Sequence, residues 1–130
     1  MTDYQTITVQ DNLGEWHKIN YYSIRDLNKK IFYIKTSIFI FDDVVFGENV
    51  RLSYGTIIYN DVHIGDNVQI FSCSTINVYT QIGDFVVIGD NVKIGSNVRI
   101  GNNVRIENQV KIANGAKIKS LSIVTSDVTK

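Results

Sequence analysis

The stretch VVIGDNVKIGSNVRIGNNV, residues 86–104, repeats one six-residue pattern three times. Each unit has two apolar residues separated by one variable residue, followed by a glycine and two residues drawn from Asp, Asn and Ser. Residues two apart on a strand point the same way, so the apolar pair marks one face. Asp and Asn tolerate left-handed backbone angles and bond within their own turns. Each unit is therefore predicted to be a short strand followed by a corner.

The same register runs without insertion from Thr36 to Thr125, which gives fifteen units. The fifth position is Ile in twelve of them, and the third position is small or β-branched throughout. These are the only consistently apolar columns, so both are expected to point inward. A single unit cannot bury its apolar residues alone, and the units must coil and stack in layers about 4.8 Å apart.

These runs, together with VHIGDNV at residues 62–68, resemble the bacterial hexapeptide-repeat acyltransferase superfamily. The resemblance implies an all-β fold, a left-handed parallel β-helix with three hexads in each triangular coil, and a homotrimer as the usual assembly. Fifteen hexads would make about five coils, with residues eighteen apart lying one above the other. The predicted organisation is an N-terminal cap over residues 1–35 and a hexapeptide-repeat β-helix over residues 36–130.

The first 35 residues lie outside the repeat register. YQTITVQ, residues 4–10, alternates as a strand does. An open β-helix end presents unpaired strand edges, so a capping segment is the favoured interpretation. A segment that binds substrate or sets specificity is the alternative. At the other end of the repeat the sequence indicates no capping helix.

His63 is the candidate catalytic base. The resemblance implies acyl transfer from coenzyme A or acyl carrier protein to a hydroxyl or amine, at a site between adjacent subunits. Such transfer needs a base and donors for the developing oxyanion, and histidine is the usual base. The chain contains only His17 and His63, and His63 occupies an outward position of the repeat. The alternatives are an ordinary exposed histidine for His63 and a bystander in the cap for His17.

Asn60 and Asp61 accompany His63 as candidate site residues. In several related sugar acyltransferases the histidine opens the hexad, whereas here that position is Asn60 and His63 comes three places later. Asn60 would orient or polarise an acceptor hydroxyl, and Asp61 would orient an imidazole. Both residues are also ordinary turn formers at a corner.

The charge of the repeat changes along the chain. Residues 36–89 hold one basic and six acidic residues, whereas residues 90–119 hold six basic and two acidic residues. The family usually binds coenzyme A beside later coils, which makes the outward cations there candidate ligands for its phosphates: Lys93, Arg99, Lys111 and Lys117. The alternative is a solvated face that keeps the sheets soluble.

Composition excludes several other classes. The charges balance, which argues against nucleic-acid and membrane partners, and neither a signal peptide nor an apolar run of membrane-spanning length is present. Two histidines and one cysteine, Cys73, do not supply the three-histidine zinc site of the β-helical carbonic anhydrases, so no metal is expected. A cytoplasmic protein is the default expectation.

The predicted function is acetyl-CoA-dependent transfer to a sugar or nucleotide-linked amino sugar in surface polysaccharide synthesis. The alternative is a non-catalytic trimeric β-helix that serves as a scaffold or assembly module; the unbroken register, without the loop that often covers the family's active site, favours it. Outward apolar residues of the early coils, such as Phe39, Ile57 and Phe85, are interpreted as trimer interface and contact with the cap.

Overall fold

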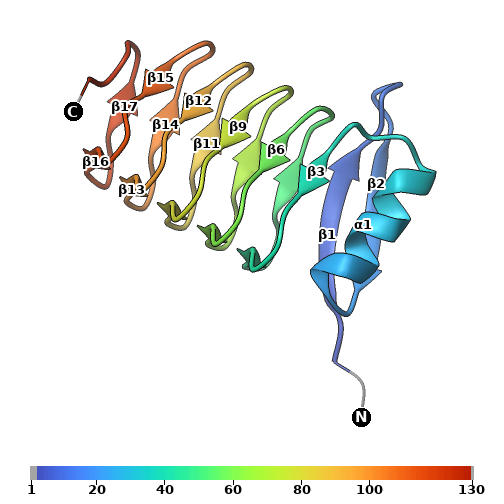
Figure 1. Ribbon diagram of the computed structural model, residues 1–130. Helices are drawn as coiled ribbons and strands as arrows, with labels where there is room; N and C mark the ends of the chain where they lie inside the picture. The colour runs from blue at the N-terminus through green and yellow to red at the C-terminus, as the bar shows by residue number, and fades with distance from the viewer. Residues whose placement is uncertain (1–2, 130) are drawn as a thin grey trace.

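The computed structural model describes residues 3–129, and its dominant feature is a left-handed parallel β-helix of five turns (Figure 1). Each hexad contributes one two-residue strand from its fourth and fifth positions. The fifteen strands are β3 (Phe39–Ile40), β4 (Val45–Phe46), β5 (Arg51–Leu52), β6 (Ile57–Ile58), β7 (His63–Ile64), β8 (Gln69–Ile70), β9 (Thr75–Ile76), β10 (Gln81–Ile82), β11 (Val87–Ile88), β12 (Lys93–Ile94), β13 (Arg99–Ile100), β14 (Arg105–Ile106), β15 (Lys111–Ile112), β16 (Lys117–Ile118) and β17 (Ile123–Val124).

The strands form three parallel stacks, here called faces. Face A contains β5, β8, β11, β14 and β17; face B contains β3, β6, β9, β12 and β15; face C contains β4, β7, β10, β13 and β16. Residues eighteen apart pair across neighbouring layers, as His63 does with Gln81 on face C. The predicted five coils and their outward columns are therefore confirmed.

The core lies inside the coil, and the third and fifth positions fill it. Ile58, Ile70 and Ile88 at fifth positions are fully buried. Three third positions carry buried hydroxyls, and each hydroxyl has a partner; the Ser74 hydroxyl donates to the Gly89 carbonyl at 2.6 Å. A buried polar group with a partner avoids the desolvation cost of an orphaned one, so these positions do not weaken the stack.

The corners follow from the first two positions of each hexad. All fifteen second positions have positive φ, which Asn97 adopts at 57° and Tyr79 at 60°. At many first positions the side-chain oxygen accepts an amide hydrogen bond from the layer before, as Asp84 does from the Asp66 N–H at 2.8 Å. The Asp and Asn residues of the repeat therefore shape each corner and also join it to the next layer.

The N-terminal segment continues face A beyond the first coil. Strand β1 (Gln5–Gln10) pairs in parallel with β5 and antiparallel with β2 (Trp16–Tyr21). Ile7, Val9 and Tyr21 are buried against the β-helix core. The hairpin thus covers the edge of β5, and the capping segment expected from the sequence is confirmed, including the strand predicted at residues 4–10.

Helix α1 (Ile24–Tyr33) covers the remaining end of the coil (Figure 1). Leu27 and Ile31 are buried, and the Asn28 side chain donates to the Ile40 carbonyl on the exposed edge of face B at 2.7 Å. This helix was not expected from the sequence, although the apolar spacing within it and the Ser23 hydroxyl that accepts the Asp26 N–H are ordinary helix signals.

The C-terminal tail caps part of face B. Val128 pairs with Ile112, and the two backbone bonds of Val128 join it to Lys111 and Ala113. The spacing from Ile112 to Val128 is sixteen residues rather than eighteen, so the tail leaves the hexad register. Among residues 3–129 the only helix is α1, and it is too short and too polar to cross a bilayer.

Candidate functional site

His63 lies on face C in the second coil, with its imidazole exposed to solvent. Val62 and Ile64 on either side of it are buried, which forces the side chain between them outward. Its neighbours in the column are Val45 in the layer before and Gln81 in the layer after. The outward placement predicted from the hexad register is what the structure shows.

Asn60 and Asp61 form the corner that leads into β7. Asp61 has a φ of 60°, and its N–H donates to the Asp42 carbonyl at 3.2 Å. The Asn60 carbonyl accepts from the Tyr79 N–H at 3.2 Å. Within the described residues, no hydrogen bond joins the His63 imidazole to either side chain. Both residues act here as turn formers, in the same coil as His63.

Two further residues share the surroundings of His63. Tyr79 lies directly above the corner of Asp61, and its ring is largely exposed. Gln81 pairs with His63, and its side-chain oxygen accepts a hydrogen bond from the Arg99 guanidinium at 3.0 Å. Tyr79 is not among the site residues predicted from the sequence. Its place in the hexad, eighteen residues after Asp61, was the available signal.

The four cations proposed for coenzyme A fall on two faces. Lys93 and Lys111 pair on face B, whereas Arg99 and Lys117 pair on face C with His63. None of the four forms an ion pair within the described residues, where only His17–Asp11 and Lys30–Asp26 do so. Their charges are therefore free to meet phosphate groups. One chain brings two of them to the histidine face and two to the adjacent face.

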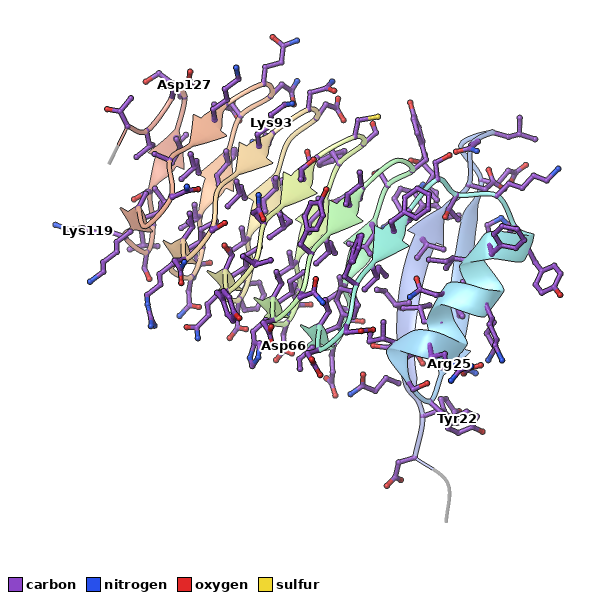
Figure 2. All side chains as sticks on the ribbon, viewed as in Figure 1. Tyr22, Arg25, Asp66, Lys93, Lys119 and Asp127 are labelled. Atoms are coloured by element: carbon purple, nitrogen blue, oxygen red, sulfur yellow. The ribbon has the colours of Figure 1, made fainter. Side chains whose placement is uncertain are left out.

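Face B has a hollow of about 430 Å³ between Lys93, Lys111 and the C-terminal tail. Asp127 lines it and accepts the Lys111 N–H at 2.9 Å, which fixes the tail beside the column of lysines (Figure 2). His63 lies on face C and does not line this hollow.

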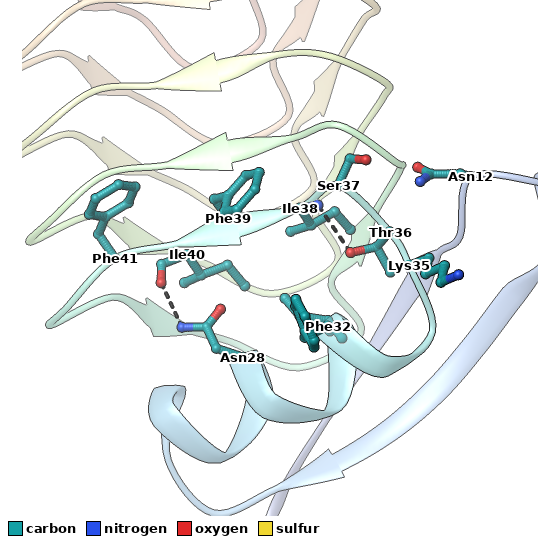
Figure 3. A pocket seen from close by; sticks show the side chains of 11 residues that line it. Asn12, Asn28, Phe32, Lys35, Thr36, Ser37, Ile38, Phe39, Ile40 and Phe41 are labelled. Atoms are coloured by element: carbon teal, nitrogen blue, oxygen red, sulfur yellow. Dashed lines mark hydrogen bonds between the residues drawn. The ribbon is translucent and has the colours of Figure 1, made fainter.

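A larger hollow, of about 590 Å³, separates α1 from face B at the first coil (Figure 3). Phe32, Phe39 and Phe41 line it, and the ring of Phe41 stacks on Tyr59 with 4.9 Å between centroids. Phe39 remains 59% exposed. The cap thus leaves this apolar surface open to solvent.

The remaining reactive side chains have local roles. His17 bonds through its Nε2 to the Asp11 carboxylate at 2.8 Å, within the hairpin of the cap. This hydrogen bond lowers the pKa of Asp11, and the Leu13 and Glu15 amides that also donate to the carboxylate act in the same direction. Cys73 is an exposed corner residue with a φ of 60°. His17 is therefore a structural residue of the hairpin.

A comparison with known protein families identifies the same six-residue repeat in this chain. Residues 69–102 match the family described as "Bacterial transferase hexapeptide (six repeats)". No curated protein sequence matches the chain. The matched segment lies within the β-helix described above, so the chain carries the hexapeptide repeat of that class.

Three solved structures illustrate the likeness of fold. Serine acetyltransferase isoform 3 of Entamoeba histolytica is 23% identical, with 82% of this chain and 42% of that chain covered and a TM-score of 0.46. WeeI of Acinetobacter baumannii AYE is also 23% identical, with 81% and 58% covered and a TM-score of 0.42. The acetyltransferase domain of PglB from Neisseria gonorrhoeae FA1090 is 14% identical, with 82% and 58% covered and a TM-score of 0.42. The chain thus spans 42–58% of the length of these proteins, and none of the three identifies a substrate for it.

Proposed function

We propose that this protein is a cytoplasmic acyltransferase that moves an acetyl group from acetyl-CoA to a sugar or nucleotide-linked amino sugar of surface polysaccharide synthesis. The observation that carries the proposal is an exposed histidine, His63, on a hexapeptide-repeat β-helix whose central repeats match a transferase family. It is the only histidine of the repeat, and imidazole is the usual base for acyl transfer at neutral pH.

The proposed chemistry needs one base and a binding site for each substrate. His63 takes the proton of the substrate hydroxyl or amine as that group attacks the thioester carbonyl. The carbon–sulfur bond then breaks, and His63 returns the proton to the departing thiolate. Asn60 and Asp61 would orient the acceptor and the imidazole. Lys93, Arg99, Lys111 and Lys117 would bind the phosphates of coenzyme A, which fits their lack of carboxylate partners in the chain.

Calorimetric titration with acetyl-CoA and coenzyme A tests the proposal directly. We expect saturable binding of both ligands, weakened by Lys93→Gln or Arg99→Gln because each removes a charge that would meet phosphate. Lys29→Gln, which removes an exposed cation from α1, is the matched control and should bind as the unaltered protein does. Absence of measurable heat at millimolar ligand would contradict an acetyl-CoA-dependent function.

We also propose that the protein works as a homotrimer. Exposed apolar side chains persist on the early coils, among them Phe39, Tyr79 and Phe85, and such surface marks contact with another chain. A neighbouring subunit would also supply one wall of a cleft at His63. Sedimentation equilibrium is expected to report three times the chain mass of 14.7 kDa at micromolar concentration. A stable monomer under these conditions would remove the composite site.

A non-catalytic trimeric scaffold is the second candidate. It is favoured by the position of His63, which lines neither of the two hollows described above. The two candidates differ in one measurable property, since a scaffold would form the trimer without binding acetyl-CoA.

A further inference from the structure

The cap places three polar side chains in one row across face A. The register pairs Thr8 with Lys18 on one side and with Arg51 on the other. All three point outward, because the alternate residues Val9, Ile19 and Leu52 are buried. Neighbouring strands are about 4.8 Å apart, so the two cations flank the Thr8 hydroxyl across a span of roughly 10 Å between Cα atoms.

Trp16 fixes the position of one of these cations. The Arg51 guanidinium carbon lies 4.3 Å from the centroid of the indole ring, which is a cation–π contact. Stacking occupies a face of the guanidinium and leaves its N–H edge available as a planar donor. The sequence holds a single tryptophan, so this residue also reports on the site.

The two cations have no acidic partner. Neither Lys18 nor Arg51 takes part in the ion pairs of residues 3–129. Glu48 lines the neighbouring hollow together with Lys18 but not the one that holds Arg51. Arg51 is moreover the only basic residue between Thr36 and Gly89. The row therefore carries two exposed positive charges that an anion could bind.

A hollow of about 430 Å³ lies over this row. Its lining consists of Thr8, Trp16, Lys18, Asn49 and Arg51, which together offer an ammonium, a guanidinium, a hydroxyl and a side-chain amide. Donors of this kind converge on oxyanions, and the guanidinium and ammonium form the stronger, charge-assisted bonds.

We infer that the junction of the cap and the first coil is a binding site for the oxyanion of a small ligand, a phosphate group or a carboxylate. The site lies on face A, whereas His63 lies on face C, and it does not depend on the proposed acyl transfer. The cap is then a ligand-binding element as well as a cover for the first coil.

Intrinsic fluorescence of Trp16 tests the inference on the full chain. Titration with inorganic phosphate should give a saturable change, half complete in the millimolar range because the anion is small. Acetate is titrated in parallel, and sodium chloride at matched ionic strength measures simple screening. Saturation by phosphate alone assigns the site to phosphate groups, and saturation by both assigns it to oxyanions in general.

Two variants and a matched control make the test specific. Lys18→Gln leaves the indole–guanidinium contact in place and should weaken phosphate binding about tenfold or more, as expected for loss of a charge-assisted bond. Arg51→Gln should abolish the response. Arg105→Gln removes an exposed cation from the same column of face A, outside the hollow, and should bind phosphate as the unaltered protein does. An identical response to chloride, or unweakened binding in Lys18→Gln, would overturn the inference.

Discussion

Gly83→Ala is expected to lower the free energy of unfolding by about 2–4 kcal/mol, through overpacking and the loss of an interlayer hydrogen bond. A Cβ atom at this residue would lie 2.7 Å from the Gly101 carbonyl oxygen and would also meet the side-chain oxygen of Asn102. That oxygen accepts the Asp84 N–H at 2.8 Å and so joins the two layers. The Gly83 N–H is itself bonded to the Ile100 carbonyl at 2.8 Å, so the backbone cannot move away from the next layer without weakening this bond.

Urea denaturation followed by circular dichroism measures this effect. Glu107→Ala is the control, because it changes an exposed residue at the same position of a hexad on another corner and should alter stability by no more than about 0.5 kcal/mol. All variants are compared at one protein concentration, since association would contribute to the measured stability. An unaltered urea midpoint for Gly83→Ala would show that the layers can separate locally without cost.

The fixed period of the sequence explains why most of the fold could be predicted. Once Val62 and Ile64 are placed inward, the period of six determines the direction of His63 and the period of eighteen makes Gln81 its neighbour. The positive φ angles lie at the second positions of the hexads, where Asp and Asn residues tolerate them as expected. Gly65 and Gly83 have a different role, because the next layer passes too close to both for a side chain.

The parts outside the period could not be predicted in the same way. Pairing of β1 with β5 joins Thr8 to Arg51, a contact that no repeat register implies. The row that contains Lys18 and Arg51 therefore depends on the pairing of the cap with the first coil, which the repeat does not predict. Likewise, the sixteen-residue step from Ile112 to Val128 departs from the eighteen-residue spacing between the layers of the repeat.

For the candidate site residues, the sequence predicts only that the side chains point outward and on which face of the coil each one lies. The hexad places His63 outward and Lys93 and Arg99 on different faces, because position in the coil decides the face. The surroundings of His63 in the proposed homotrimer depend on association between chains, which a repeat pattern does not encode residue by residue.

His63→Ala is expected to lower the turnover of an acetyl-CoA-dependent reaction by about 10²-fold or more, the usual effect of removing a general base. The fold should remain intact, because the exposed imidazole contributes little to the core. His17→Ala, which removes the other histidine from its bond to Asp11 in the cap, serves as the control and should leave turnover unchanged.

The comparison of these two histidine variants also decides the mechanism. If His63→Ala turns over at the rate of the unaltered enzyme, the acceptor loses its proton without a protein base. An amine acceptor that binds in its neutral form would then be the better hypothesis, with Asn60 as the residue that positions it. If only His63→Ala is impaired, the proton passes to the imidazole on face C. The cleft must then lie against β7, because a base has to stand within hydrogen-bond reach of the proton that it removes.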